Sequence, residues 1–402
     1  MPSETYLISD IASFSRETIS KSYKTYVDYL DTGSITNNCM NSLERYYDLS
    51  KLPSRAKKAV REKDIIYSTV RPNNRHFGIV PATCDNMVVS TGFSVIRANK
   101  QYVLPEYLYY ILTSNEIVEL LQSIAEQSVS TYPSINDTDI GNISVELPSI
   151  DEQQAIIEII EPINQTIRNK HMINDNLTRE CQLILNYYIS TNQTHSSTIG
   201  DHAVIIDCLH SKKPELQESG KRFIQLDNIR DDGLLDFSNQ FWISDSDYNL
   251  WTSRCEVSEG DIVITNVGRI GAVSQMPIGE KAAMGRNMTC IRPHSNPAFL
   301  ITYLLSERMR NEIEYNTDAG TIMNALNVRS IPNLVILAFE ESVQYEIETI
   351  LRSIRQKMEN NLKESHRLVQ LRDYLLPKLM SGEIDISTIE LPTKYSFNPT
   401  NQ

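Results

Sequence analysis

Apolar residues recur at helical spacing along two long stretches of the chain. The first seam consists of Ile156, Ile160, Ile163, Ile167 and Leu177. The second seam lies 191 residues later and consists of Ile347, Leu351, Ile354, Met358 and Leu368. Steps that alternate between four and three residues keep one stripe of a helix turned toward a partner helix, as in coiled coils. The pattern therefore predicts two long helices.

Both seams are interrupted by polar residues at the same two positions. In the first seam these are Lys170 and Asn174, and in the second they are Asn361 and Ser365. Two ordinary amphipathic helices on separate cores would also show apolar stripes. They would not explain a shared register with a shared polar interruption. We therefore favour a duplicated helix that pairs with its own copy.

The repeat continues through the rest of the chain with a period near 190 residues. Matching segments predict short strands that follow acidic turn residues, apolar stretches with helical spacing, and short segments that end in asparagine. They are Lys63–Val70 with Gly260–Val267, Leu108–Ser114 with Leu300–Ser306, and Ser134–Asn136 with Ala325–Asn327. Each half of the chain thus predicts one globular domain followed by one helix.

The duplication predicts an α/β (α+β) fold, with two similar mixed domains joined by two long antiparallel coiled-coil helices in a pseudo-two-fold arrangement. The expected parts are a first domain at 1–150, a helix at 151–190, a polar linker at 191–198, a second domain at 199–338, a helix at 339–380 and a loosely ordered tail at 381–402. A helix of about 35 residues spans about 50 Å. Such a rod would set the domains about 14 base pairs apart on duplex DNA, whose dyad their symmetry would match.

Charge is distributed unevenly along the chain. The net charge of −13 alone argues against binding DNA phosphates. Residues 51–100, however, hold ten Lys or Arg against three acids, whereas residues 101–200 hold three against thirteen. The first segment is a candidate phosphate-facing patch, and a solvated basic surface remains the alternative.

The remaining composition indicates a cytoplasmic protein. No 18-residue apolar run occurs, and the first residues lack the pattern of a secretory signal. The six cysteines lie far apart without a Cys-x-x-Cys pair, which argues against structural zinc and against a disulfide framework.

Several segments, in this order and on this duplicated frame, resemble the specificity subunits of type I restriction–modification systems. They are Pro53–Lys57, Lys63–Pro72, Leu147–Ile156 and Leu375–Ile384. The resemblance implies two target-recognition domains that each read one half of an asymmetric, bipartite DNA site, with two helical spacers acting as a ruler. One departure is that Asp151–Gln154 has Phe339–Gln344 as its counterpart, which makes partner docking at the second spacer less secure.

The resemblance also implies partners that carry the chemistry. Two modification subunits would dock on the spacers, bind S-adenosylmethionine and methylate adenine N6, and restriction (motor-nuclease) subunits that use ATP and Mg would join them. This chain itself has no phosphate-binding Gly-rich loop, no Glu-x-Lys nuclease triplet and no histidine pair at metal-ligand spacing. Asn296–Phe299 approaches a methyltransferase motif but lacks its second proline, and we interpret it as the start of a helix. We expect no catalytic residue, metal or cofactor in this chain.

Base reading requires Arg for guanine and Asn or Gln for adenine, presented from loops or helix ends. In the first domain the candidate DNA-binding residues are Arg71, Asn73, Asn74, Arg75 and His76, with Thr131 and Tyr132 in a second loop. In the second domain they are Arg269, Arg286 and Asn287, with Lys221 and Arg222 for phosphates. Ordinary polar loops are the alternative for each. Because the frames match while these loops differ, two different half-sites are expected.

Two other functions remain open from the sequence. A coiled-coil assembly adaptor could have the same architecture without reading bases, and an enzyme with an unrecognised site is also conceivable. For a DNA reader with so few net positive charges, we expect weak binding by the isolated chain and tight binding only with its partners.

Overall fold

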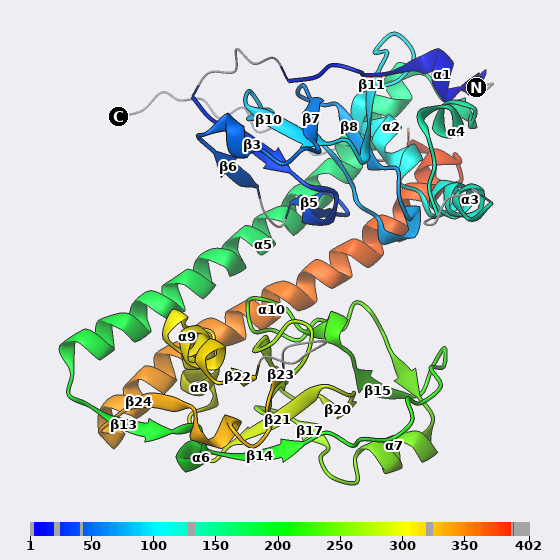
Figure 1. The fold of residues 1–402 in the computed structure, drawn as a ribbon. Coiled ribbons are helices and arrows are strands. Elements are labelled where there is room, and N and C mark those ends of the chain that lie inside the picture. Colours follow the sequence, from blue (N-terminus) through cyan, green and yellow to red (C-terminus); the bar gives the residue numbers. More distant parts are fainter. Residues whose placement is uncertain are drawn as a thin grey trace. The chain divides into compact units, whose positions relative to one another are not determined.

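Figure 1 shows the computed structural model, which describes residues 4–19, 25–40, 43–127, 133–318, 325–386 and 389. The chain divides into two compact units. Met1–Gln165 with Val369–Gln402 forms the first, and Thr166–Leu368 forms the second. Two long helices, α5 (Ile150–Thr191) and α10 (Glu341–Met380), contribute to both units. The first unit is therefore completed by residues from the far end of the sequence.

The first unit contains two four-stranded sheets. One is antiparallel, in the order β2 (Ala12–Phe14), β11 (Phe93–Ala98), β8 (Ile65–Ser68) and β9 (Phe77–Ile79). The other has the order β6 (Glu44–Tyr46), β3 (Val27–Leu30), β10 (Met87–Ser90) and β7 (Ala56–Ala59). In this second sheet β3 and β10 run parallel, while the outer strands are antiparallel to their neighbours.

Helices and short strand pairs complete the first unit. The helices are α1 (Ile8–Ile11), α2 (Pro105–Leu112), α3 (Asn115–Glu126) and α4 (Asp137–Gly141). The strand pairs are β1 (Glu4–Leu7) with β12 (Ser144–Leu147) and β4 (Ile35–Thr36) with β5 (Cys39–Met40). Apolar side chains of α2 and α3 share one core with Ile65 of β8, with Ile156 and Ile160 of α5, and with Leu379 of α10.

The second unit is built in the same way. Its antiparallel sheet has the order β14 (Ala203–Asp207), β21 (Met288–Pro293), β18 (Ile262–Thr265) and β19 (Val273–Gln275). Its second sheet has the order β16 (Trp242–Ile243), β15 (Lys221–Ile224), β20 (Lys281–Met284) and β17 (Val257–Ser258). Its helices are α6 (Ile199–His202), α7 (Asp245–Trp251), α8 (Pro297–Leu304) and α9 (Glu307–Tyr315). Its short strand pairs are β13 (Thr194–Thr198) with β24 (Val335–Phe339) and β22 (Thr317–Asp318) with β23 (Ala325–Leu326).

The matching strand orders confirm the duplication that the sequence predicts. In each unit the second sheet contains one parallel pair, β3 with β10 or β15 with β20. One ion pair recurs as well. The Arg97 guanidinium binds both oxygens of Asp64 at 2.8 Å, and Arg292 binds both oxygens of Asp261 at 2.9 and 2.7 Å. The same charged pair thus ties the β8–β11 and β18–β21 neighbours together.

Both long helices have a buried glutamine in their first turn, although its hydrogen-bond partner differs. Gln153 and Gln344 lie 191 residues apart, and both are buried. Gln153 Oε1 accepts from the Leu104 N–H at 2.9 Å, and Gln344 Oε1 accepts from the Phe339 N–H at 3.4 Å. The departure noted in the sequence therefore leaves this buried amide in place.

Two expectations need correction. Residues 191–198, expected as a polar linker, include β13, whose Thr194 pairs with Phe339 just as Glu4 of β1 pairs with Leu147. The partner strand is far away in sequence, so local composition could not reveal it. The tail is also attached at its beginning, because Ile384, Ile386 and Ile389 pack against the first core. Residues 387–388 and 390–402 lie outside the described part of the chain.

In the second unit α5 and α10 pair antiparallel. Lys170 Nζ lies 2.6 Å from Glu364 Oε2, and the Tyr188 hydroxyl donates to Glu346 at 2.7 Å. Later residues of α5 thus contact earlier residues of α10, as in an antiparallel pair. Four seam residues of this unit are buried and three are half-buried. They are Ile167, Ile347, Leu351 and Met358, followed by Leu177, Ile354 and Leu368.

The seams serve the domain cores as well as the helix pair. Ile347 and Leu351 lie in one core with Cys181 and Leu185 of the opposite helix and with the strands of the second unit. In the first unit Ile156 and Ile160 are buried, Ile163 is half-buried, and Arg372 Nη1 donates to Asn164 Oδ1 at 3.4 Å. The two helices are therefore also in contact within the first unit.

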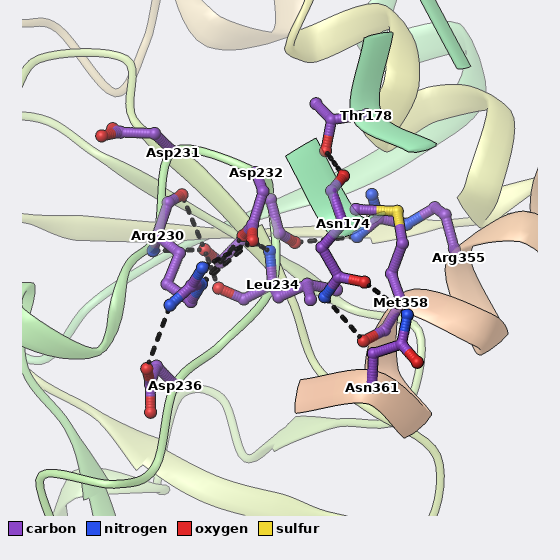
Figure 2. Close-up of polar contacts among 12 residues, drawn as sticks. Asn174, Thr178, Arg230, Asp231, Asp232, Leu234, Asp236, Arg355, Met358 and Asn361 are labelled. Carbon is purple, nitrogen blue, oxygen red and sulfur yellow. Dashed lines mark hydrogen bonds and ion pairs between the residues drawn. The ribbon is translucent and has the colours of Figure 1, made fainter. Parts of the chain in front are cut away.

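Two of the polar residues that interrupt the seams, Asn174 and Asn361, meet in the second unit (Figure 2). Asn361 Nδ2 donates to Asn174 Oδ1 at 2.9 Å, and Asn174 Nδ2 donates to the Met358 carbonyl at 3.0 Å. Both asparagines and Ser365 are buried. A buried amide pair tolerates only one relative position of two helices, because any slip leaves its donors and acceptors unsatisfied.

A second polar cluster attaches a turn of the second unit to the helices. The Arg230 guanidinium binds Asp232 at 2.9 Å and Asp236 at 3.3 Å. His366 of α10 lies 3.0 Å from Asp236. Burial alone would raise the pKa of the Asp236 carboxyl, but hydrogen bonds from His366 and Ser238 hold that pKa well below its usual range.

No helix in the described ranges is long and apolar enough to span a membrane.

Replacing Asn361 with leucine should destabilise the second unit. The variant leaves Asn174 Oδ1 buried without a donor, which costs about 1–3 kcal/mol in free energy of unfolding. The double variant Asn174→Leu/Asn361→Leu removes both partners and should recover most of this loss. Urea denaturation of the full chain measures both, with Asn360→Leu on the exposed face of α10 as the control. Equal losses for the control and Asn361→Leu would contradict the assigned role.

His171 should make the second unit less stable in mild acid. Burial lowers the pKa of its imidazole, and the Arg230 charge lowers it further. The unfolded chain therefore takes up the proton first, so stability falls as the pH drops below about 6.5, by at most about 1.4 kcal/mol per pH unit. The variant His171→Gln should show a shallower loss between pH 7.5 and 5.5 in urea titrations. Parallel curves for the two proteins would refute this assignment.

Candidate nucleic-acid interface

The first candidate loop joins β8 to β9. A short 3₁₀ turn at Pro72–Asn74 follows Arg71, and both Arg71 and Arg75 adopt positive φ, at 50° and 53°. Pro72 is buried, whereas Asn73 and Asn74 are exposed. The loop therefore points two amide side chains, the type that reads adenine, toward solvent on a fixed backbone.

Arg75 and His76 of this loop also hold its base. Arg75 Nη2 donates to Asn115 Oδ1 at the start of α3 at 2.7 Å. His76 Nδ1 lies 2.6 Å from the Ile35 carbonyl, which only accepts, so this nitrogen carries the proton. His76 is half-buried. These contacts give both residues a positioning role in addition to the predicted DNA contact.

The second candidate loop of this domain is described only from Pro133 onward. Thr131 and Tyr132 themselves fall outside the described residues. The residues that follow them are bonded to the first loop, because the Arg71 N–H donates to the Pro133 carbonyl at 3.0 Å and the Ile135 N–H donates to Thr69 at 2.8 Å. The structure thus brings two stretches, about 60 residues apart in sequence, to one surface.

In the second domain Arg269 occupies the equivalent connection, between β18 and β19. It is half-exposed but paired, because Nη1 donates to the Ile229 carbonyl at 2.7 Å and Nη2 forms an ion pair with Asp231. Ile35 and Ile229 both follow a short 3₁₀ turn after an equivalent strand. His76 and Arg269 therefore take the same place in the two domains.

Arg286 and Asn287 lie in the turn between β20 and β21. Both are exposed, and Asn287 has a positive φ of 62°. Arg286 Nη2 donates to the Ser211 carbonyl and so ties this turn to the loop after β14.

Lys221 and Arg222, expected to contact phosphates, differ in their surroundings. Lys221 is exposed, 3.7 Å from Asp245. Arg222 lies over the rings of Phe237 and Trp242, at 4.3 and 5.1 Å from their centroids, and 3.5 Å from Glu280. Lys221 is thus the more accessible of the two.

Much of the basic segment 51–100 serves the fold. Arg61 pairs with Glu17 and Lys63 with Glu106, and Arg97 pairs with Asp64. Lys51, Arg55 and Lys57 are exposed, and no carboxylate of the described ranges forms an ion pair with them. These three residues, counted in the sequence only as part of a charge excess, are additional phosphate candidates.

Sequence reasoning missed the turn that holds Arg269. Asp231 is almost fully exposed, and its only signal was the turn composition of Arg230–Gly233. Nothing in the sequence linked this turn to a loop 38 residues later.

Two groups of metal-ligand side chains occur among the described residues: Asp207 with Cys208 and His210, and Asp261 with Cys255 and Cys290. In each group an arginine already pairs with the carboxylate, Arg254 at 3.7 Å and Arg292 at 2.7 Å. A cation would have to displace that charge. The absence of a metal from this chain stays a prediction.

Asn296–Phe299 is the start of a helix, as predicted. Pro297 is the first residue of α8, and Ala298 and Phe299 are buried. The segment therefore presents no open cradle for an adenine amine.

Comparisons with known proteins agree with this architecture. A family model described as "Type I restriction modification DNA specificity domain" matches residues 2–179. The specificity subunit of the type I restriction enzyme HindI from Haemophilus influenzae is 25% identical over 94% of this chain and 99% of its own length. The MjaIX specificity subunit of Methanocaldococcus jannaschii is 23% identical over 78% of this chain and 76% of that protein.

A solved structure supports the fold. The S subunit of a type I restriction–modification system from M. genitalium matches 94% of this chain and 96% of that one, with a TM-score of 0.51 and 15% identity. Residues 2–179 match the DNA specificity domain of type I restriction–modification systems, and the relative from Haemophilus influenzae, similar over nearly the whole chain, is a specificity subunit of such a system.

Proposed function

We propose that the two domains read the two unlike halves of a bipartite, asymmetric DNA site, and that the paired helices carry two modification subunits. One observation carries the proposal. The two units share their strand order, yet the equivalent connections β8–β9 and β18–β19 differ in length and residues. Equal frames with unlike readers suit a site whose halves have different sequences.

The number of partners is suggested by the exposed faces of the helices. Leu183 of α5 and Tyr374 of α10 occupy the same position of the repeat, 191 residues apart, and are 69% and 61% exposed. Tyr187 and Leu371 lie one helical turn from them and are also exposed. Leu183 with Tyr187, and Leu371 with Tyr374, each form an exposed apolar patch, and contiguous apolar patches mark interaction sites. Because Leu183 and Tyr374 take the same position of the repeat, the two patches fit two copies of one partner, the modification subunit.

The cofactors belong to those partners in this proposal. Modification subunits would bring S-adenosylmethionine and methylate adenine N6, and restriction subunits, where present, would use ATP and Mg. The six free cysteines fit a cytoplasmic location, where double-stranded DNA is also found.

Exchanging one domain should change one half of the recognised sequence. We would replace residues 1–150 with the corresponding segment of the Haemophilus influenzae relative and map methylated adenines in cells that also make the modification subunit. Half of the site should change and the other half should stay, and exchange of residues 199–338 should give the converse result. An unchanged site in both exchanges would favour the assembly adaptor.

Each apolar patch should hold one modification subunit. The variants Leu183→Glu and Tyr374→Glu should each lose one of two bound subunits, and the double variant should lose both, because a carboxylate would be buried at the contact. Native mass spectrometry of the assembled complex counts the subunits. Leu250→Glu, at an exposed leucine of α7, is the control. Two subunits retained by the double variant would exclude these patches.

A further inference from the structure

The turn Ile229–Leu234 fixes the orientation of the Arg269 guanidinium plane. Nη1 donates to the Ile229 carbonyl at 2.7 Å, and Nη2 pairs with Asp231. The side chain of Arg269 is 47% exposed. A guanidinium has five N–H groups, and these contacts use only two of them. The side chain is therefore oriented before any ligand binds, and three N–H groups of its planar guanidinium remain available.

The turn itself has little freedom. Asp232 accepts from Arg230 at 2.9 Å and from the Leu234 N–H at 3.1 Å. Gly233 has a φ of +78°, and a Cβ atom there would lie 2.7 Å from Leu305 Cδ1. The positive φ favours glycine, and any larger residue there would also have to displace the Leu305 methyl group.

Helix α10 anchors the turn through Arg355 (Figure 2). This side chain is 3% exposed, and it donates from Nη2 to the Gly233 carbonyl at 2.8 Å and from Nε to Gln275 Oε1 at 3.0 Å. Burial lowers the pKa of its guanidinium. Burying a charged arginine costs free energy of folding when its partners are an uncharged carbonyl and an amide. Stability therefore does not explain why Arg355 is present. Its contacts connect α10 to the turn, and the turn connects to Arg269.

Among the residues of the first unit that the structure describes, no such connection occurs. The residue 191 positions before Arg355 is Asn164, which donates to the Tyr110 hydroxyl at 3.3 Å and accepts from Arg372. The place of Arg269 is taken there by His76. The arrangement is therefore particular to the second domain.

We propose that Arg269 reads a guanine in the half-site of the second domain, and that Arg355 is the positioning residue through which α10 fixes it. Guanine offers O6 and N7 in the major groove, a pair of acceptors that a planar guanidinium matches with two donors. Asp231 and the Ile229 carbonyl hold the plane of the fork, which reduces the rotamer freedom lost on binding. This inference rests on the proposed function.

The test uses the full chain with its modification subunits and a duplex library in which each position of the site is varied. With Arg269→Gln, preference for guanine should fall about tenfold to one-hundredfold at one position of the second half-site, and the first half-site should be unchanged. Asp231→Asn should weaken the same preference less. Arg269→Gln that keeps every base preference would overturn the inference. A wild-type complex without a bipartite site would instead overturn the proposed function.

The positioning role of Arg355 has its own readout. Arg355→Met should relax the same guanine and no other base, Arg355→Lys should retain part of the preference, and Arg269→Gln/Arg355→Met should be no worse than Arg269→Gln. Lys357→Met, at an exposed lysine of α10 two residues later, is the matched control and should change nothing. Equal weakening of both half-sites by Arg355→Met would show a merely structural role. If Arg355→Met does not fold, Arg355→Lys and Asp231→Asn decide.

Discussion

The antiparallel contact between α5 and α10 is the constraint on which the other features depend. Its apolar residues do not form a separate seam, because Ile156 and Ile160 close the core of the first unit and Ile347 and Leu351 close that of the second. Each core also includes side chains from the opposite helix, such as Leu379 and Leu185. A shift of one helix against the other would therefore disturb both the domain interiors and the buried amides of Asn174 and Asn361.

The periodic parts of the structure could be predicted from the sequence. The seams, the shared polar interruption and the duplication follow from spacing alone, and the structure has the two helices at 150–191 and 341–380. The structure also pairs Asn174 with Asn361, which no repeat could show, because the repeat relates Asn174 to Ser365. A repeat gives equivalent positions, whereas an antiparallel contact joins positions that are not equivalent.

The candidate DNA contacts were less predictable for the same reason. Residue type and loop position suggested Arg269, Arg222 and His76, but their surroundings come from distant segments: Asp231, the rings of Phe237 and Trp242, and the Ile35 carbonyl. Long-range contacts decide which arginine is open to a ligand and which is occupied. The ion pairs Asp64–Arg97 and Asp261–Arg292, by contrast, are the same in both domains. They stabilise the sheets without involving the β8–β9 and β18–β19 connections, so these connections can differ in sequence.

The division of the first unit between the two ends of the chain has a consequence for biosynthesis. Residues 1–165 leave the ribosome long before residues 369–402, which complete their unit. At a synthesis rate of about 5–20 residues per second, at least about ten seconds pass before the end of α10 is made and can pack against Ile156 and Ile160. During that interval the nascent domain offers an uncovered helix face, a natural target for chaperones, so a prematurely terminated product would leave even its N-terminal half unfinished.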